Sequence, residues 1–355
     1  MQLSVRLESW FRSGTQFRYD VFALPLSERA LISAIAKAAS APRQRQNLSR
    51  KKVKESLVAG IGDDCAVLRL DANRDLLVTT DFSLEGVHFR RDWHPAAAVG
   101  HKCLARGLSD IAAMGGEPLA VFLSLALPEK LEQVWVDGFV KGLLKLAKAF
   151  RVPLAGGDTA QSLSGVLADI TVIGFVPEGK AVLRSGAQPG DRIYVTGALG
   201  GAAAALKMLL SKQKVDPRKF ARHFYPEPRV AIGKFLREKS IPSSMIDISD
   251  GLSTDLSHIC EESGVGAEIW SDKIPRAEMG VGPVDVNLAL HGGEEYELLF
   301  TASRLTKVPS RIAGVTVTCI GEIKRVRSIF ISDENGARSL LRAGGWEHFR
   351  KTSAK

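Results

Sequence analysis

Residues 59–68 read AGIGDDCAVL and place two adjacent carboxylates, Asp63 and Asp64, in a run of small and apolar residues. Adjacent like charges repel each other, and apolar surroundings raise the free energy of keeping them ionised. Because Gly and Asp are both favoured in turns, a turn is the simplest interpretation of this pair taken alone. The alternative is a metal site, and the rest of the chain has to decide between the two.

The composition is that of an ordinary globular protein. The chain has 355 residues, of which 45% are hydrophobic and 25% charged, and this length suits two domains better than one. The sequence shows no apolar run near the ~20 residues of a membrane-spanning helix. The cysteines are far apart, with no C-x-x-C pair and no secretory signal, which predicts a reducing cytoplasm and neither a disulfide framework nor a zinc site. They are Cys65, Cys103, Cys260 and Cys319.

Much of the net charge of +9 comes from residues 43–54, which contain Arg and Lys but no acid. Such a run could attract nucleic acid or another polyanion. It has no interleaved aromatic residues for stacking on bases, so we interpret it as a solvated loop and do not expect a nucleic-acid partner.

Periodicity and turn residues predict a mixture of strands and helices. Some predicted strands are adjacent along the chain, which indicates an α+β fold rather than strict βαβ winding. We predict a variable extension over 1–25, a first domain over 26–180 and a second over 181–355, with a Gly-rich boundary near 177–190. Helices are expected at 26–39, 95–114, 131–150, 201–210 and 252–262, and strands at 58–68, 76–80, 119–127, 152–154, 167–176, 192–196, 244–248 and 296–301.

Two stretches resemble phosphate-binding loops but lack essential parts. Residues 174–180 (GFVPEGK) match the start of a Walker A loop, yet Ala181 follows in place of Ser or Thr and Pro177 interrupts the loop. Residues 196–201 (TGALGG) lack the G-x-G-x-x-G spacing of dinucleotide sites. The chain therefore shows no standard nucleotide fingerprint.

A set of aspartates lies beside apolar strands or Gly turns rather than on charged helix faces. Each has a plain explanation: Asp81 and Asp158 as turn residues, Asp110 as a partner of Arg106, and Asp250 as a helix cap. Converging carboxylates, however, would raise one another's pKa and destabilise the fold unless cations were present. Hard oxygen ligands suit Mg²⁺, so the set predicts a Mg²⁺ site that holds nucleotide phosphates without a P-loop. Its members are Asp63, Asp64, Asp81, Asp110, Asp158, Asp247 and Asp250.

With these motifs in place, the sequence resembles the thiamine-monophosphate kinases, relatives of aminoimidazole ribonucleotide synthetase and selenophosphate synthetase. The resemblance runs from about residue 26 to 349. It rests on blocks in the family's order: GIGDDCAVL, TTDFSLEGVHF, LSDIAAMGGEP, AGGDT, LRSGAQPGD, VTGALGG, IDISDGLSTDL and HGGEEYELLF.

The resemblance implies ATP-dependent phosphorylation of thiamine monophosphate to thiamine diphosphate by direct transfer, with several Mg²⁺ ions and no covalent nucleophile. It assigns Mg²⁺ binding to Asp64, Thr79, Thr80, Asp81, Asp110, Asp158, Asp247 and Asp250. ATP contacts are assigned to Gly157, Asp158, Arg184 and Ser249, and contacts with thiamine monophosphate to His88, Glu294 and Trp346. Asp63 is the less certain member of the opening pair, and orienting the loop is its alternative role.

The family also implies a two-domain α+β fold with an N-terminal α/β sandwich whose sheet packs in a homodimer, and a C-terminal α+β domain. Residues 119–127 (LAVFLSLAL) are apolar on both faces, as a doubly covered strand would be. Gly107, preceded by Arg106, replaces the Asn that the family usually has before LSD. The rival interpretations are another ATP-dependent enzyme of the superfamily, or a polyanion- or RNA-binding protein on the same scaffold.

Overall fold

The computed structural model describes residues 30, 57–59, 62–69, 73–279 and 282–348. The predicted extension over 1–25 and the basic run at 43–54 lie outside the described residues, as does the predicted helix at 26–39 apart from Ala30. Within the described part, no helix is both long enough and apolar enough to cross a membrane.

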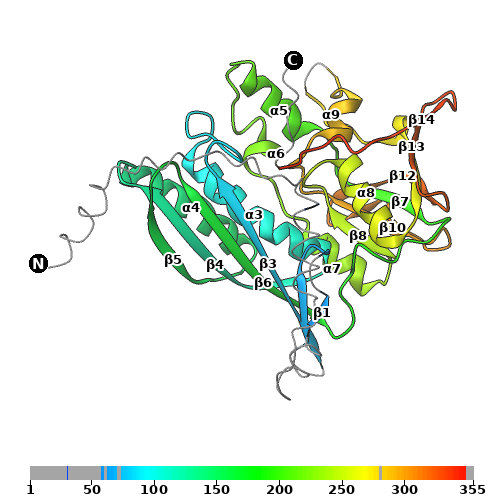
Figure 1. Cartoon of the computed structure of the whole chain (residues 1–355), viewed down its shortest axis with the longest axis horizontal. Helices are drawn as coiled ribbons and strands as arrows, with labels where there is room; N and C mark the ends of the chain where they lie inside the picture. Colours follow the sequence, from blue (N-terminus) through cyan, green and yellow to red (C-terminus); the bar gives the residue numbers. More distant parts are fainter. Residues whose placement is uncertain (1–29, 31–56, 60–61, 70–72, 280–281, 349–355) are drawn as a thin grey trace, which may run out of the picture. The chain divides into compact units, whose positions relative to one another are not determined.

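The first half of the described chain forms a sheet of six strands (Figure 1). The strand order is β1-β2-β3-β6-β4-β5, and all neighbours are antiparallel except β4 and β5. The strands are β1 (Leu57–Ala59), β2 (Ala66–Arg69), β3 (Arg74–Leu84), β4 (Glu117–Pro128), β5 (Leu154–Ser162) and β6 (Leu167–Pro177).

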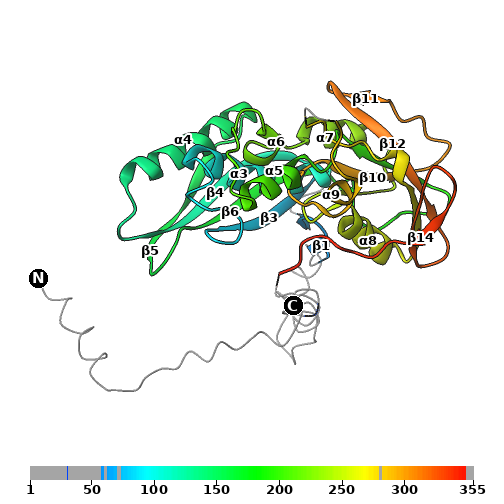
Figure 2. The same cartoon turned by 90° about the horizontal axis from the view of Figure 1, so that it is seen from above.

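Helices α3 (Ala96–Ala113) and α4 (Gln133–Ala149) lie on one side of this sheet (Figure 2). Strands alternate their side chains between the two faces, and the face toward α3 buries Leu77, Val121 and Ile170 completely. The opposite face carries Phe82 and Phe122, which are 55% and 36% exposed. The sheet therefore has one covered face and one apolar face that no described element covers.

The second half of the described chain forms a sheet of eight strands. Their order is β14-β13-β9-β12-β7-β10-β8, with β11 paired to β12. They are β7 (Arg192–Thr196), β8 (Ser244–Asp247), β9 (Gly266–Trp270), β10 (Leu298–Ala302), β11 (Arg311–Ile312), β12 (Val315–Lys324), β13 (Ile329–Ser332) and β14 (Arg338–Leu340). The accompanying helices are α5 (Gly201–Leu210), α6 (Ala221–Phe224), α7 (Val230–Glu238), α8 (Leu252–Ser263), the 3₁₀ turn η1 (Ser271–Lys273) and α9 (Val286–His291).

Helix α3 joins the two halves. It packs on β3 and β6 of the first sheet and also contacts β8 and α7 of the second half. Met245 and Phe300 of the second sheet belong to the same buried core cluster as Leu108 of α3. The predicted two-domain α+β fold is thus confirmed, and α3 is the element that positions residues of one half against the other.

Three strand predictions need correction. The strand expected over 58–68 is two strands, β1 and β2, with the Asp63–Asp64 pair between them. Asp81 does not end a strand but lies inside β3, because β3 pairs with β6 over its whole length. Asp158 does not follow a short strand but lies within β5, which pairs with β4 as far as Ser162. For Asp81 and Asp158 the strand boundary is set by pairing with a distant segment, which local sequence does not record, whereas β1 and β2 pair with each other across the turn that holds Asp63 and Asp64.

Candidate active site

Three aspartates from distant parts of the chain converge where the two halves meet. The carboxylate oxygens of Asp64, Asp110 and Asp247 lie within 4.8 Å of one another. Asp64 follows β1, Asp110 lies in the last turns of α3, and Asp247 is the final residue of β8. The structure thus brings together three of the predicted Mg²⁺ ligands.

Hydrogen bonds from hydroxyl groups fix two of these carboxylates. Thr79, on the inner face of β3, donates to Asp110 at 2.5 Å, and Ser109 donates to Asp247 at 2.5 Å. Ser109 and Asp110 are consecutive in α3, so one turn of this helix organises ligands from both halves. Asp81 lies on the same face of β3 as Thr79, two residues along the strand.

The electrostatics of the cluster favour a bound cation. Burial raises the pKa of Asp110 well above its usual value, and the neighbouring Asp81, Asp247 and Asp64 raise it further. Burial and then Asp64 raise the pKa of Asp247 in the same way, and burial raises that of Asp81. Desolvated carboxylates at this separation are an unfavourable arrangement unless positive charge compensates them.

Arg184 supplies one compensating charge. Its guanidinium donates to both oxygens of Asp64, at 3.1 and 3.0 Å. Its backbone N–H donates to Asp63 at 2.7 Å. The two members of the opening pair therefore have different partners: Asp64 faces the acidic cluster, and Asp63 fastens the loop to the chain at Arg184.

Two predicted metal ligands lie away from the cluster. Thr80 projects to the outer face of β3, opposite Thr79 and Asp81, and Asp158 lies on β5 at the edge of the sheet. Strands β6 and β4 separate β3 from β5, so three spacings, about 14 Å, lie between these strands. Asp158 pairs in register with Ser124 and therefore shares its outer face. Gly157 precedes it with φ 150°, and a Cβ there would lie 1.8 Å from the carbonyl oxygen of Leu123.

A second group of predicted residues gathers at the start of α8. The carbonyl of Asp250 accepts the backbone N–H of Trp346 at 3.0 Å, and that of Ser249 accepts the N–H of Glu294 at 2.7 Å. The structure thereby brings together the predicted Mg²⁺ residue Asp250, the ATP residue Ser249 and the substrate residues Glu294 and Trp346. Trp346 as a whole residue is 55% exposed.

The sequence analysis missed Asp255, which holds this loop in place. Its buried carboxylate accepts the backbone N–H groups of Asp250 and Gly251 at 3.2 and 3.0 Å. Burial, and then Asp250, raise the pKa of Asp255 well above its usual value. Its place in the block IDISDGLSTDL, in the first turn of the helix that follows Ser249 and Asp250, is the signal that could have drawn attention to it.

Glu294 is held by two buried cations that the sequence analysis did not assign to the site. Lys102 donates to one carboxylate oxygen at 2.5 Å, and Arg106 lies 3.6 Å from the other. Burial alone would raise the pKa of Glu294, but Lys102 and Arg106 hold it at about 2. Two basic residues four apart in helix α3 are the sequence signal for this contact, because they share one helix face.

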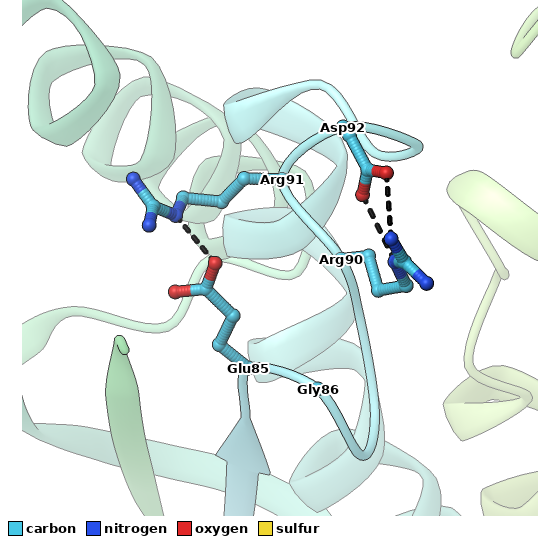
Figure 3. A pocket seen from close by; sticks show the side chains of 5 residues that line it. All are labelled: Glu85, Gly86, Arg90, Arg91 and Asp92. Atoms are coloured by element: carbon cyan, nitrogen blue, oxygen red, sulfur yellow. Dashed lines mark hydrogen bonds and ion pairs between the residues drawn. The ribbon is translucent and has the colours of Figure 1, made fainter. Parts of the chain in front are cut away.

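His88 lies in the loop that follows β3. Its Nδ1 accepts the backbone N–H of Leu84 at 2.9 Å, which fixes the ring. The same loop borders a pocket of about 430 Å³ lined by Glu85, Gly86, Arg90, Arg91 and Asp92. Figure 3 shows that both arginines are engaged, Arg91 with Glu85 at 2.6 Å and Arg90 with Asp92 at 2.9 Å.

The donor set fits a hard divalent cation. The three converging side chains are all carboxylates, which are hard oxygen ligands. The pKa values of Asp110 and Asp247 stay raised although Arg184 is near, because its guanidinium forms its ion pair with Asp64. Asp64, Asp110 and Asp247 are the residues that would hold such an ion.

Family models match both halves of the chain. Residues 62–176 match the N-terminal domain of AIR synthase related proteins, and residues 188–309 match the C-terminal domain. Together with the two sheets and the acidic cluster between them, these matches place the chain in the class of AIR synthase related proteins.

Sequence relatives identify the family within this class of proteins. The thiamine-monophosphate kinase of Salmonella typhimurium is 41% identical over 278 residues, which is 74% of this chain and 83% of the relative. That of Escherichia coli K12 is 39% identical over 304 residues, 82% of this chain and 91% of the relative. The chain belongs to the thiamine-monophosphate kinase family and is an enzyme.

Solved structures agree in fold. The structure described as AaThiL complexed with AMPPCP and TMP has a TM-score of 0.76 and 32% identity, and the match covers 91% of this chain and 97% of that one. A thiamine-monophosphate kinase from Stenotrophomonas maltophilia gives a TM-score of 0.66 at 34% identity, over 80% of this chain and 93% of that one. The hydrogenase maturation protein HypE in complex with ATP, at 18% identity and a TM-score of 0.63, over 84% of this chain and 96% of that one, shares the fold.

Proposed function

We propose that this protein transfers the terminal phosphoryl group of ATP to the phosphate of thiamine monophosphate, which gives thiamine diphosphate. The observation that carries the proposal is the convergence of Asp64, Asp110 and Asp247 beside Arg184. The relatives named above are thiamine-monophosphate kinases, and one solved relative is described as complexed with AMPPCP and TMP.

The chemistry needs charge neutralisation and in-line placement of two anions rather than a nucleophile. Mg²⁺, when bound, would neutralise the phosphates and bridge them to the carboxylates. Asp64, Asp110 and Asp247 would hold the ions, with Asp81 beside them. Asp250 would hold a further ion at the start of α8. Thr79 and Ser109 keep two of the carboxylates aimed at this region through the hydrogen bonds described above.

Arg184 would contact ATP. Its guanidinium now binds Asp64 in a bidentate pair, a geometry that also matches a phosphate group. We propose that Arg184 exchanges Asp64 for a phosphate oxygen when Asp64 takes up a metal ion. Ser249 is a further proposed ATP contact of this chain. Gly157 and Asp158 lie together on β5, away from the cluster, so their proposed ATP contacts would be made in the site of a partner copy.

The acceptor would bind at Glu294, Trp346 and His88. The carboxylate of Glu294, kept ionised by Lys102 and Arg106, would face the cationic thiazolium ring, and Trp346, which is 55% exposed, would stack on a ring of the acceptor. His88 lies in the loop after β3 and is included on the family assignment. The covalent change is confined to the two substrates, so no side chain is proposed as a nucleophile.

We propose a homodimer formed through the outer face of the six-stranded sheet. Phe82, Phe122 and Leu119 are exposed to 55%, 36% and 51%, which is an unusual amount of apolar surface for one side of a sheet. Asp158 lies on this same face and about 14 Å from β3. If Asp158 binds metal as the family assignment implies, it would do so in the site of the partner copy rather than in its own.

A cytoplasmic location remains part of the proposal. It is supported by the four cysteines, all of which are free thiols. The alternative of a polyanion-binding role depends on residues 43–54, outside the described part of the chain.

The test is an assay of the purified protein with ATP and Mg²⁺ on thiamine monophosphate. Thiamine serves as the control acceptor, because it lacks the phosphate that would be attacked. We expect thiamine diphosphate from the first acceptor and no product from the second. Turnover of a different phosphate or carboxylate, with none on thiamine monophosphate, would instead identify another enzyme of the superfamily.

A further inference from the structure

Arg106 uses every nitrogen of its guanidinium on a different part of the site. Nε donates to the hydroxyl of Tyr296 at 3.1 Å, and Nη2 lies 3.6 Å from Glu294. Nη1 donates to the carbonyl of Phe82 and lies 3.9 Å from Asp81. The side chain is only 14% exposed, so it reaches these groups inside the protein rather than from the surface. One side chain of α3 thus connects β3 to residues 294–296.

The segment that Arg106 contacts is conformationally strained. Glu294 and Tyr296 have φ values of 64° and 52°, in the left-handed region that non-glycine residues rarely adopt. Such a conformation persists only where surrounding contacts determine it. Backbone hydrogen bonds to Ser249 and Ile248 hold one side of the segment, and Arg106 and Lys102 hold the other.

We infer that Arg106 is a positioning residue, which fixes the strained Glu294–Tyr296 turn against β3 and so aims the carboxylate of Glu294 at the acceptor. The inference rests on the proposed function, because it takes Glu294 as a contact of thiamine monophosphate. Lysine cannot fully replace arginine in this role. The guanidinium of arginine is planar and donates in three directions, whereas lysine carries a single compact ammonium group.

The geometry predicts two effects of opposite sign when the guanidinium is removed. The turn that carries Glu294 loses a fixed partner, so acceptor binding weakens. Asp81 loses a cation 3.9 Å away, so a divalent cation binds the acidic region at least as tightly as before. A general loosening of the protein would instead weaken both acceptor binding and divalent-cation binding.

The test compares Arg106→Met, Arg106→Lys and Arg229→Met with the wild type. Arg229 is a matched control: its side chain is 13% exposed, and it binds the buried Glu297 at 2.6 Å, outside the contacts of Arg106. Three quantities are measured: kcat with KM for each substrate, the Kd of thiamine monophosphate by calorimetry without ATP, and the Kd of Mn²⁺ by electron paramagnetic resonance.

For Arg106→Met we expect the KM and Kd of thiamine monophosphate to rise at least tenfold, the KM of ATP to stay within threefold, and Mn²⁺ to bind equally or more tightly. Arg106→Lys should fall between Arg106→Met and the wild type. Arg229→Met should lower Tm but leave the acceptor KM within twofold. An acceptor KM within twofold of wild type in Arg106→Met, a parallel rise for ATP, or weaker Mn²⁺ binding would overturn the inference.

If Arg106→Met does not fold, Tyr296→Phe decides the question. It removes only the hydroxyl that accepts from Nε, and we expect a rise of about threefold in the acceptor KM with the KM of ATP unchanged. An unchanged acceptor KM would overturn the inference. Failure of the proposed function is distinguishable, because it would appear as a wild-type protein that neither binds nor phosphorylates thiamine monophosphate.

Discussion

At the scale of single residues, the site is an arrangement of buried charges that are unfavourable without partners. The pKa of Asp110 is raised by burial and by three other aspartates, while that of Glu294 is held at about 2 by two cations. The same helix, α3, carries Asp110, Lys102 and Arg106. The protein thus keeps a cation-deficient region, around Asp110, close to a cation-rich one that surrounds the carboxylate of Glu294.

Replacing Asp110 with Asn tests the cation-deficient region. Removing one charge relieves repulsion in the metal-free protein, so we expect Tm without Mg²⁺ to rise by about 1–4 °C. The stabilisation by added Mg²⁺ and the turnover should both be lost. Thermal melts with and without Mg²⁺ measure this, and the exposed Asp137→Asn in α4 is the control for a lost charge. A wild-type response to Mg²⁺ in Asp110→Asn would contradict the metal assignment.

A buried histidine pair provides a pH-dependent prediction. His94 and His223 lie with their Nε2 atoms 3.0 Å apart. Burial, followed by the nearby Lys102, lowers the pKa of His94 to about 4 and that of His223 to about 3. Since the unfolded chain takes up these protons near pH 6.5, the unfolded state binds more protons as pH falls below that value, and folding stability is lost there.

The double variant His94→Asn, His223→Asn removes this proton uptake. Between pH 6.5 and 4.5, we expect its free energy of unfolding to fall by about 4 kcal/mol less than that of the wild type, about 2 kcal/mol for each histidine. Urea denaturation at several pH values measures the difference. Parallel curves for the two proteins would show that the pair is not kept neutral by its surroundings.

At the scale of elements, the site depends on how strands and helices end. Helix α8 is preceded by Gly251, which has φ 115°, and Asp255 in the first turn of the helix accepts the backbone N–H groups of Asp250 and Gly251. This contact fixes the loop that carries Ser249 and Asp250, whose carbonyls hold Glu294 and Trp346. One capping interaction therefore supports proposed contacts of metal, ATP and acceptor.

We expect Asp255→Ala to lower the free energy of unfolding by about 1–2 kcal/mol and to raise the KM values of both substrates. Asp255→Asn keeps an oxygen for the same backbone donors and should be close to the wild type in both respects. Urea denaturation and steady-state kinetics make the comparison. Equal losses in the two variants would assign the role to the charge of Asp255 rather than to its hydrogen bonds.

At the scale of the whole molecule, the outer face of the six-stranded sheet and the position of Asp158 both point to a second copy of the chain. Asp81 faces α3, and Asp158 lies on the opposite face at the sheet edge. No rotation of side chains within one chain brings these carboxylates onto one ion. The family assignment gives both Asp81 and Asp158 to Mg²⁺, although one chain holds them on opposite faces of the sheet. A site formed by Asp81 of one copy and Asp158 of the other in a homodimer would satisfy both observations.

Mixed dimers test the composite site. Asp81→Asn and Asp158→Asn should each be inactive as homodimers, because every site then lacks one carboxylate. When the two variants are co-expressed and the mixed dimer is purified by two different tags, one site per dimer would be intact, so we expect up to half of the wild-type turnover. Inactive mixed dimers would place Asp81 and Asp158 in the same chain's site, and a monomeric mass by light scattering would remove the proposal.

The sequence by itself determined the α+β class, most of the helices and strands, and the family, because local periodicity, Gly turns and short blocks such as GIGDD and ISDGL are written in consecutive residues. Only the tertiary structure decided which residues meet. It joined Asp64, Asp110 and Asp247, separated Asp158 from them, and placed Lys102, Arg106 and Asp255 in or beside the site. The physical reason is that strand pairing and helix packing are long-range: β3 extends past Asp81 only because β6 lies beside it, and Arg106 reaches Glu294 only because α3 spans both halves of the chain.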